Sequence, residues 1–153
     1  MSESPLIAQQ AAALISGETD QIAALANASA LLKTTDPGLS WAGFYLLKNG
    51  ELVVGPFQGG VACAHIAMGK GVVGQCAANL NSRAVSDVTK VKNYIACDSN
   101  AKSEFVAPMI DQNGQLFAVL DLDAPSTNYF DDPAKQESLT AFAKAVMDKL
   151  PGK

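Results

Sequence analysis

Two Asn-Gly dipeptides, each lying between strand-like runs, constrain the fold of this chain more than any other feature. Asn49-Gly50 separates WAGFYLLK from ELVVGPF, and Asn113-Gly114 divides the segment EFVAPMIDQNGQLFAVLDLD. Asn-Gly between β-rich runs is the strongest short-range signal of a β-hairpin, because both residues accept the positive φ angles of a tight turn. The sequence therefore predicts two antiparallel hairpins.

Helical patterns stand at both ends of the chain. Apolar residues recur at helical spacing from Pro5 to about Ser16 and from Asp20 to about Lys33, where Ser29 is small enough to keep the second apolar face continuous. Near the C-terminus, Phe130-Asp131-Asp132-Pro133 starts a final helix that runs to about Leu150, with an aspartate as its cap and proline in its first turn.

Shorter elements are expected between the two hairpins. The run GVACAHIAM predicts a strand, a short helix follows around Gln75 to Leu80, and Arg83 to Val85 forms another short strand. The segment from Ser86 to Ser103 has little periodicity and is long for a loop, which is typical of a functional loop. Helices beside an antiparallel sheet give an α+β fold.

Composition sets the class of protein. With 153 residues, 48% of them hydrophobic and 17% charged, the chain is expected to be one globular domain over residues 1–153. Within it we expect N-terminal helices at 5–34, the sheet and an active-site loop at 39–124, and a C-terminal helix at 132–150. A net charge of −4 with scattered lysines and arginines argues against a nucleic-acid partner.

The ends of the chain and its cysteines bear on the compartment. The sequence has no secretory signal and no apolar run of the roughly 18 residues that a membrane helix needs, so we expect a cytoplasmic protein. Three cysteines without a CxxC pair, and a single histidine, indicate neither a disulfide framework nor a metal site. Free thiols in a reducing compartment remain.

An acidic cluster is predicted on the second hairpin. If Asn113-Gly114 is a two-residue turn, Gln112 faces Gln115, and Glu104 then stands opposite Asp123. Side chains alternate along a strand, so Asp121 lies on the same face as Asp123, ~7 Å from it. Carboxylates in such close company have at least one raised pKa, which makes a side chain a proton donor near neutral pH.

A plain alternative is that these acids end a strand and face water. Pro108 complicates the register, because a proline lacks the N–H group that a sheet uses and favours an edge strand or a shifted pairing. Spacing alone leaves both interpretations open.

The first hairpin offers an aromatic surface. Trp41, Gly43 and Tyr45 share one strand face, and Gly43 leaves a gap between the two rings. Such a gap suits a methyl or cationic group. Aromatic residues on strands are more often part of a core, so this pattern is weak by itself.

The three cysteines differ in their surroundings. Cys97 follows a short apolar piece and precedes the polar run DSNAKS, where a thiol can be reached and ionised. Cys63, in the predicted strand, and Cys76, on the short helix, are better taken as small buried residues at this point. His65 shares a strand face with Cys63, but a histidine placed like this is usually structural.

Five motifs in order resemble a known family. They are WAGFYLL at 41–47, GPFQGGVACAHI at 55–66, GKGVVG at 69–74, YIACDSNAKSE at 94–104 and LDLD at 120–123. Together they are similar to the free methionine-R-sulfoxide reductases, which are built on a GAF domain, and the resemblance covers about residues 20–148. It implies a GAF-like fold and the reduction of free L-methionine (R)-sulfoxide rather than the residue within proteins.

The resemblance also implies roles for particular residues. Cys97 matches the cysteine whose thiolate attacks the sulfoxide sulfur. Glu104 and Asp123 are assigned to the sulfoxide oxygen, with Asp121 supporting them or the substrate ammonium. The other matched positions bind substrate: Trp41 and Tyr45 as a wall for its methyl group, and the backbone of Gly71, Val72 and Val73 for its carboxylate.

Recycling in the family needs a second thiol. Cys63 matches a cysteine suited to form a disulfide with Cys97, which thioredoxin or another dithiol would reduce. The chain departs from the family at Val73, where members commonly carry a third cysteine, and Cys76 stands three residues later as a possible auxiliary thiol. We expect Cys63 alone to resolve, with no bound cofactor, no metal and a possible homodimer.

Two other functions stay open. GAF domains are often sensory modules that bind small molecules, and the fold alone would favour that class. A redox sensor, in which Cys63 and Cys97 form a disulfide as a signal, is the third possibility, although it gives the acidic cluster no purpose. Saturable turnover of a small sulfoxide separates the enzyme from both.

Overall fold

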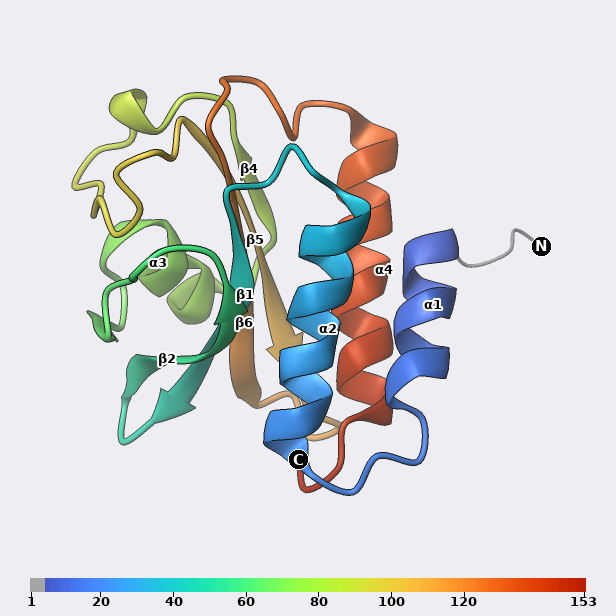
Figure 1. Cartoon of the computed structure of the whole chain (residues 1–153). Coiled ribbons are helices and arrows are strands. Elements are labelled where there is room, and N and C mark those ends of the chain that lie inside the picture. Colours follow the sequence, from blue (N-terminus) through green and yellow to red (C-terminus); the bar gives the residue numbers. More distant parts are fainter. Residues whose placement is uncertain (1–4) are drawn as a thin grey trace.

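A six-stranded antiparallel sheet forms the centre of the protein in a computed structural model, which describes residues 5–153 (Figure 1). The strands follow the order β3-β2-β1-β6-β5-β4 across the sheet. They are β1 (Trp41–Lys48), β2 (Glu51–Gln58), β3 (His65–Ala67), β4 (Arg83–Val85), β5 (Ser103–Ile110) and β6 (Leu116–Ala124). The helices are α1 (Leu6–Ile15), α2 (Gln21–Thr35), α3 (Gly71–Asn79) and α4 (Pro133–Lys149), with a 3-10 turn, η1, at Val88–Lys90. The predicted α+β fold is confirmed.

Helices cover both faces of the sheet. Figure 1 shows α1, α2 and α4 on one face, with α3 and the long loops on the other. Strand alternation divides the apolar side chains between two cores: Phe44 and Leu46 of β1 pack toward α1, α2 and α4, whereas Trp41 and Tyr45 pack toward α3. Whatever shares the α3 face with Tyr45 therefore lies away from the large helical core.

The first hairpin turns as predicted. Lys48 pairs with Glu51 across a two-residue turn in which Asn49 and Gly50 have φ angles of 53° and 82°. Two positive φ angles are the signature of the type I′ turn that Asn-Gly favours.

The second hairpin does not have the predicted two-residue turn. The N–H of Asp111 donates to the carbonyl of Gln115, so these two residues face each other around a three-residue loop. The Asp111 carboxylate holds this loop by accepting from the N–H groups of Asn113 and Gln115. The prediction that Gln112 faces Gln115 is therefore wrong, because a short aspartate side chain organised a longer turn.

A register shift restores the predicted pairing further along. Ile110 pairs with Leu116, but Met109 pairs with Ala118, so β6 carries one extra residue at this point. Glu104 then stands opposite Asp123, as predicted. Pro108 fits because β4 pairs only with residues 104–106 of β5, which leaves the proline on an uncovered stretch of edge.

Several shorter elements differ from expectation. The predicted strand in GVACAHIAM is limited to β3, so Cys63 lies in irregular chain before it. Helix α3 begins at Gly71 rather than near Gln75, four residues early. On α1 and α2, the apolar residues Leu6, Leu14 and Ile22 are exposed, and alanines take four of the eight buried positions.

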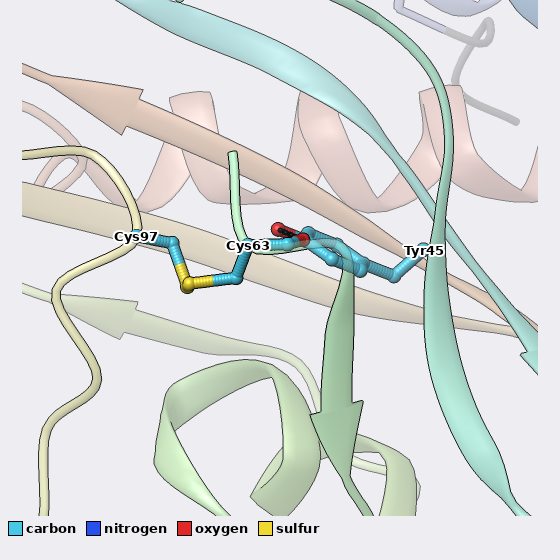
Figure 2. Close-up of a disulfide and its surroundings, with 3 residues drawn as sticks. All are labelled: Tyr45, Cys63 and Cys97. Carbon is cyan, nitrogen blue, oxygen red and sulfur yellow. Dashed lines mark hydrogen bonds between the residues drawn. A yellow bond between two sulfur atoms is a disulfide. The ribbon is translucent and has the colours of Figure 1, made fainter. Parts of the chain in front are cut away.

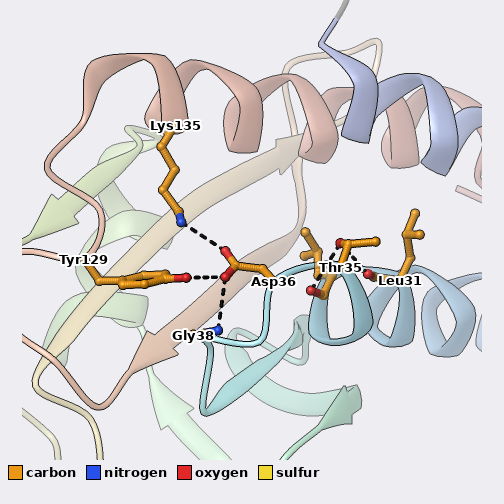
Figure 3. A network of polar contacts seen from close by, with 7 residues as sticks. Leu31, Thr35, Asp36, Gly38, Tyr129 and Lys135 are labelled. Carbon is orange, nitrogen blue, oxygen red and sulfur yellow. Dashed lines mark hydrogen bonds and ion pairs between the residues drawn. The ribbon is translucent and has the colours of Figure 1, made fainter.

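A polar network joins segments that are far apart in the sequence (Figure 3). Asp36, which caps the C-terminal end of α2, accepts hydrogen bonds from the N–H of Gly38 and the hydroxyl of Tyr129, and pairs with Lys135 of α4 at 3.0 Å. The ammonium of Lys135 also lies 3.9 Å from the centre of the Tyr129 ring. The network fixes the chain that leads into β1 and the chain that leaves β6. Among residues 5–153, no helix is long and apolar enough to cross a membrane.

Candidate active site

Three carboxyl groups meet on the α3 face of the sheet. Glu104 on β5 and Asp121 and Asp123 on β6 project from this face because they alternate with residues of the helical core. Each is only 5% exposed, and one carboxyl oxygen from each residue lies within 4.8 Å of the other two. The structure thus brings together the three acids that register predicted, and it rejects the alternative of acids facing water.

Burial and mutual repulsion keep protons on these acids. Burial, followed by the charge of Asp123, raises the pKa of Glu104 to about 8. Burial first, and Glu104 next, raises the pKa of Asp121 well above its usual value, and burial with Asp121 does the same for the pKa of Asp123. Oδ1 of Asp121 is buried without a hydrogen-bond partner among the described residues. The three acids, here called the carboxyl trio, can therefore donate protons near neutral pH.

A disulfide joins Cys63 to Cys97 (Figure 2). Cys97 lines the same cleft as the carboxyl trio. It connects the irregular chain before β3 to the loop before β5; the cysteines are 34 positions apart in the sequence, and their Cα atoms are 5.0 Å apart. The hydroxyl of Tyr45 donates to the carbonyl oxygen of Cys63 at 3.2 Å. Two half-buried thiols in two loops can thus meet at one point.

One narrow cleft is lined both by a cysteine of the disulfide and by the carboxyl trio. Its lining includes Cys97 and the carboxyl trio, together with Tyr45, Ile66, Lys70, Gly71, Val72, Val73, Tyr94, Ile95 and Asp98. With the disulfide formed, the space open to the centre of a water molecule is about 20 Å³, and one water needs about 10–15 Å³ by this measure. The cleft is therefore nearly closed in this state.

The aromatic wall is arranged differently from the prediction. Tyr45 lines the cleft, but Trp41 lies behind it, 2% exposed, and stacks on Phe57 with ring centres 4.9 Å apart. No gap opens over Gly43, since a Cβ atom there would lie 2.3 Å from that of Phe57. Phe57 on β2 was missed because a bulge in the β1–β2 pairing sets its register.

The first turn of α3 borders the cleft. A helix leaves its first backbone N–H groups without partners inside the helix, and Gly71, Val72 and Val73 occupy this turn. These groups and the nearby Lys70 give this part of the cleft lining a positive character. Gly71, Val72 and Val73, which are predicted to meet a carboxylate, thus all line the cleft.

The remaining candidates lie outside the cleft. Cys76 is buried on α3, and burial, followed by the charges of Asp121 and Glu104, raises the pKa of its thiol to about 12. His65 is exposed and contacts Glu51 at 2.8 Å rather than Cys63. Neither has the surroundings of a reactive group.

Comparison with known proteins identifies the family. The free methionine-R-sulfoxide reductase of Escherichia coli is 44% identical over 124 residues, which cover 81% of this chain and 74% of the relative. The chain belongs to the free methionine-R-sulfoxide reductase family. No protein-family model matches the chain.

Solved structures agree with this membership. The free methionine-R-sulfoxide reductase of Neisseria meningitidis, in complex with its substrate, has a TM-score of 0.88 and 35% identity, covering 98% of this chain and 93% of that one. A protein of Burkholderia vietnamiensis described as a GAF sensor has a TM-score of 0.90 and 40% identity, covering 94% and 90%. The reductase family and a GAF sensor thus share this α+β GAF fold, so the site must decide between them.

Sequence reasoning missed five residues that line the cleft, because nothing in their local sequence marks them as site residues. They are Ile66, Lys70, Tyr94, Ile95 and Asp98. The weak signal was the length of the loop before β5, which predicted a functional segment without indicating which side chains turn inward.

Proposed function

We propose that this protein reduces free L-methionine (R)-sulfoxide to methionine, with Cys97 as the nucleophile. The observation that carries the proposal is the Cys63–Cys97 disulfide at the edge of a cleft whose wall holds three buried carboxyl groups. A sulfoxide loses its oxygen only if that oxygen is protonated, and a thiolate supplies the electron pair. The site combines both functions.

The first step transfers oxygen from substrate to enzyme. The Cys97 thiolate attacks the sulfoxide sulfur while the carboxyl trio delivers a proton to the oxygen. The S–O bond of the substrate breaks, methionine leaves, and the hydroxyl ends on Cys97 as a sulfenic acid. Glu104 and Asp123 serve the oxygen in this assignment, and Asp121 supports them or accepts from the substrate ammonium, which would give its unpartnered Oδ1 a donor.

The second step returns the enzyme to its starting state. The Cys63 thiol attacks the sulfenic sulfur of Cys97, water leaves, and the disulfide forms. A dithiol of the thioredoxin type then reduces it, and becomes a disulfide itself. Cys76 takes no part in this proposal, because its buried thiol has a raised pKa and lies outside the cleft.

Substrate binding uses both poles of the cleft. In this proposal, the substrate carboxylate accepts hydrogen bonds from the N–H groups of Gly71, Val72 and Val73. The substrate ammonium lies next to the carboxyl trio. Tyr45 provides the wall for the terminal methyl group, with Trp41 supporting that wall from behind. Because the oxidised cleft has room for about one water, we expect the cleft to widen and admit the substrate once reduction breaks the bond between Cys63 and Cys97.

Turnover is the experiment that tests this function. We expect R-selective consumption of free methionine sulfoxide with dithiothreitol and with thioredoxin, and loss of activity in Cys97→Ser. Methionine sulfoxide within a peptide serves as the comparison substrate. Absence of turnover with both reductants would instead favour a ligand-binding or redox-sensing GAF module.

No metal and no bound cofactor enter this mechanism. The carboxyl trio is compact enough to hold a cation, but the raised pKa values favour protons at pH 7. Activity that survives dialysis against EDTA is expected, and loss of activity restored by a divalent ion would contradict the proposal.

A homodimer is the expected assembly. The exposed apolar residues Leu6, Leu14 and Ile22 on the N-terminal helices are compatible with a covered surface. Light scattering on the purified protein measures its molar mass directly, and a mass near the 15.9 kDa of one chain would exclude the dimer.

A further inference from the structure

Ser40 touches two parts of the candidate active site at once. It lies just before β1, where its backbone N–H donates to the carbonyl of Asp123 at 2.8 Å. Its hydroxyl donates to Oδ2 of Asp98 at 2.9 Å and also lies 3.2 Å from the carbonyl oxygen of Asp123. One residue therefore connects the strand of a catalytic acid to the residue that follows Cys97.

Asp98 organises the loop on the other side of this contact. Its Oδ1 accepts from the N–H of Asn100 at 3.0 Å, and its carbonyl accepts from the N–H of Ala101 at 3.1 Å. The side chain thus forms a local turn while its second oxygen reaches Ser40. Any movement of Asp98 moves Cys97, because the two share a peptide bond.

The Cys97 loop, residues 91–101, has few other hydrogen bonds to the rest of the protein. At its ends, the N–H of Val88 donates to Lys102, and the N–H of Lys102 donates to Ala124. Within residues 5–153, Ser40 is the one residue outside 91–101 whose side chain hydrogen-bonds to that segment. Val91 and Tyr94 also pack against the apolar core of the α3 face. The disulfide is a further link through a side chain, and it is broken in the reduced enzyme that meets substrate.

We propose that Ser40 and Asp98 are positioning residues that hold Cys97 over the carboxyl trio once its disulfide with Cys63 has been reduced. The inference rests on the proposed function. Asp98 is half-buried and lines the cleft, so the contact is partly shielded from water. A hydrogen bond to a charged group under such conditions is strong enough to bias a loop between two positions.

The charge of Asp98 gives it a second effect, which the hydroxyl of Ser40 lacks. The Asp98 carboxylate contributes to the raised pKa values of Glu104, Asp121 and Asp123, after burial and the charges within the trio. The two residues can therefore be separated by experiment: Ser40 carries the attachment alone, and Asp98 carries the attachment and the charge.

Three variants make the separation. Ser40→Ala removes the attachment, Ser40→Thr restores a hydroxyl, and Asp98→Asn keeps an oxygen acceptor for Ser40 while removing the charge. Ser86→Ala is the matched control, because its hydroxyl also donates to an aspartate, Asp131 at 2.6 Å, outside the cleft. Each variant is measured for kcat, KM, the pH profile of kcat/KM, and the dithiothreitol concentration that half-reduces the Cys63–Cys97 disulfide.

We expect Ser40→Ala to lower kcat by about tenfold, the lower end of what a charge-assisted hydrogen bond supplies. Its disulfide should be reduced at lower dithiothreitol, since the loop is no longer held next to Cys63, and its pH profile should keep its shape. Ser40→Thr and Ser86→Ala should stay within about twofold of wild type. Asp98→Asn should shift the upper limb of the pH profile to lower pH, because the carboxyl trio loses its protons sooner.

The outcomes separate this inference from the function on which it rests. If wild type turns over and Ser40→Ala matches Ser86→Ala in kcat and in disulfide reduction, the positioning role is wrong. Wild-type protein without turnover would refute the proposed function, while the disulfide measurement would still decide whether Ser40 holds the loop. A Ser40→Ala defect that Ser40→Thr does not restore would also contradict a role of the hydroxyl.

Discussion

The pKa of each acid in the carboxyl trio is raised by the same two causes, burial and the charge of another acid of the trio. The trio in turn acts on the groups beside it: burial, followed by the charges of these acids, raises the pKa of Tyr45 and Tyr94 above the usual range. Both tyrosines therefore stay neutral hydrogen-bond donors at any pH where the enzyme would work.

Removing one ionisable acid should change the pH profile of the reaction. Glu104 is protonated below about pH 8, so activity that depends on its proton falls as pH rises through that value. We expect Glu104→Gln to lower kcat/KM by about 10²- to 10⁴-fold, the usual contribution of general acid catalysis, and to remove this limb from the remaining activity. A profile unchanged in height and shape would show that Glu104 donates no proton.

The same variant should alter the dependence of stability on pH. Between pH 4.5, the ordinary pKa of glutamate, and about pH 8, its pKa in the folded protein, Glu104 is more protonated in the folded protein than in the unfolded chain. Its contribution to stability is therefore complete below pH 4.5 and is lost as pH rises through about 8. Urea unfolding from pH 5 to 9 should show a shallower decline in Glu104→Gln than in wild type, and equal slopes would contradict the raised pKa.

Cys76 is expected to be dispensable for recycling. Its thiol is buried on α3 with a pKa raised to about 12, which leaves almost no thiolate at neutral pH. Cys76→Ala should keep thioredoxin-dependent turnover within about twofold, with any loss appearing in thermal stability. Cys63→Ser serves as the contrasting variant and should lose that turnover. Equal defects in both would indicate that Cys76 belongs to the recycling path.

At the scale of elements, alternation carried more information than turn type. Facing positions on β5 and β6 placed Glu104 opposite Asp123 correctly, although the turn at Asp111 and the extra residue near Ile110 were both missed. The longer turn and the extra residue in β6 compensate for each other. A pairing shifted by one residue would move the apolar side chains of β6 from the core face to the other face, so burial selects the observed register. Side-chain periodicity within a strand thus predicted the site better than the connection did.

Irregular elements could not be predicted in the same way. The early start of α3 depends on Gly71, whose φ of +63° turns the chain sharply into the helix. The side chains that the Cys97 loop turns inward, such as Ile95 and Asp98, depend on packing against that helix start and on Ser40. These are contacts between distant segments, which leave no local pattern.

Gly71 should be sensitive to a single methyl group. A Cβ atom there would lie 3.1 Å from the side chain of Ile95, and the positive φ costs a residue other than glycine about 1–2 kcal/mol. We expect Gly71→Ala to raise KM by about tenfold, because both the N–H groups of α3 and the loop shift. Gly60→Ala, in open space, is the control and should leave KM unchanged. Equal KM values in the two variants would show that the first turn of α3 does not take part in substrate binding.

In the whole molecule, the larger apolar core and the candidate active site lie on opposite faces of the sheet. The larger apolar core lies under α1, α2 and α4, whereas the α3 face combines a smaller core with the acids and the thiols. Figure 1 shows the helical layer on one side of the sheet and α3 with the long loops on the other. The free energy of folding contributed by the larger core offsets the unfavourable burial of three acids on the α3 face. Links such as the Asp36 network fasten the helical layer to the sheet.

Breaking that network should reduce stability without abolishing the reaction. Asp36→Ala removes the partner of Tyr129 and Lys135, which at this partly exposed site contributes about 1–2 kcal/mol. Calorimetry should show Tm lower by about 3–6 °C for a chain of this size, with kcat within about twofold at 25 °C. Lys144→Ala, which loses only an exposed ion pair with Asp148, is the control. Equal Tm values would show that the network adds nothing.

The most direct measurement of the central claim is a single turnover without recycling. Reduced Cys63→Ser protein is mixed with an equal amount of free L-methionine (R)-sulfoxide, and both products are analysed by mass spectrometry. The account predicts one methionine per active site and one added oxygen on the peptide that contains Cys97. Methionine formed without that oxygen, or an unchanged substrate beside an intact thiol, would contradict it.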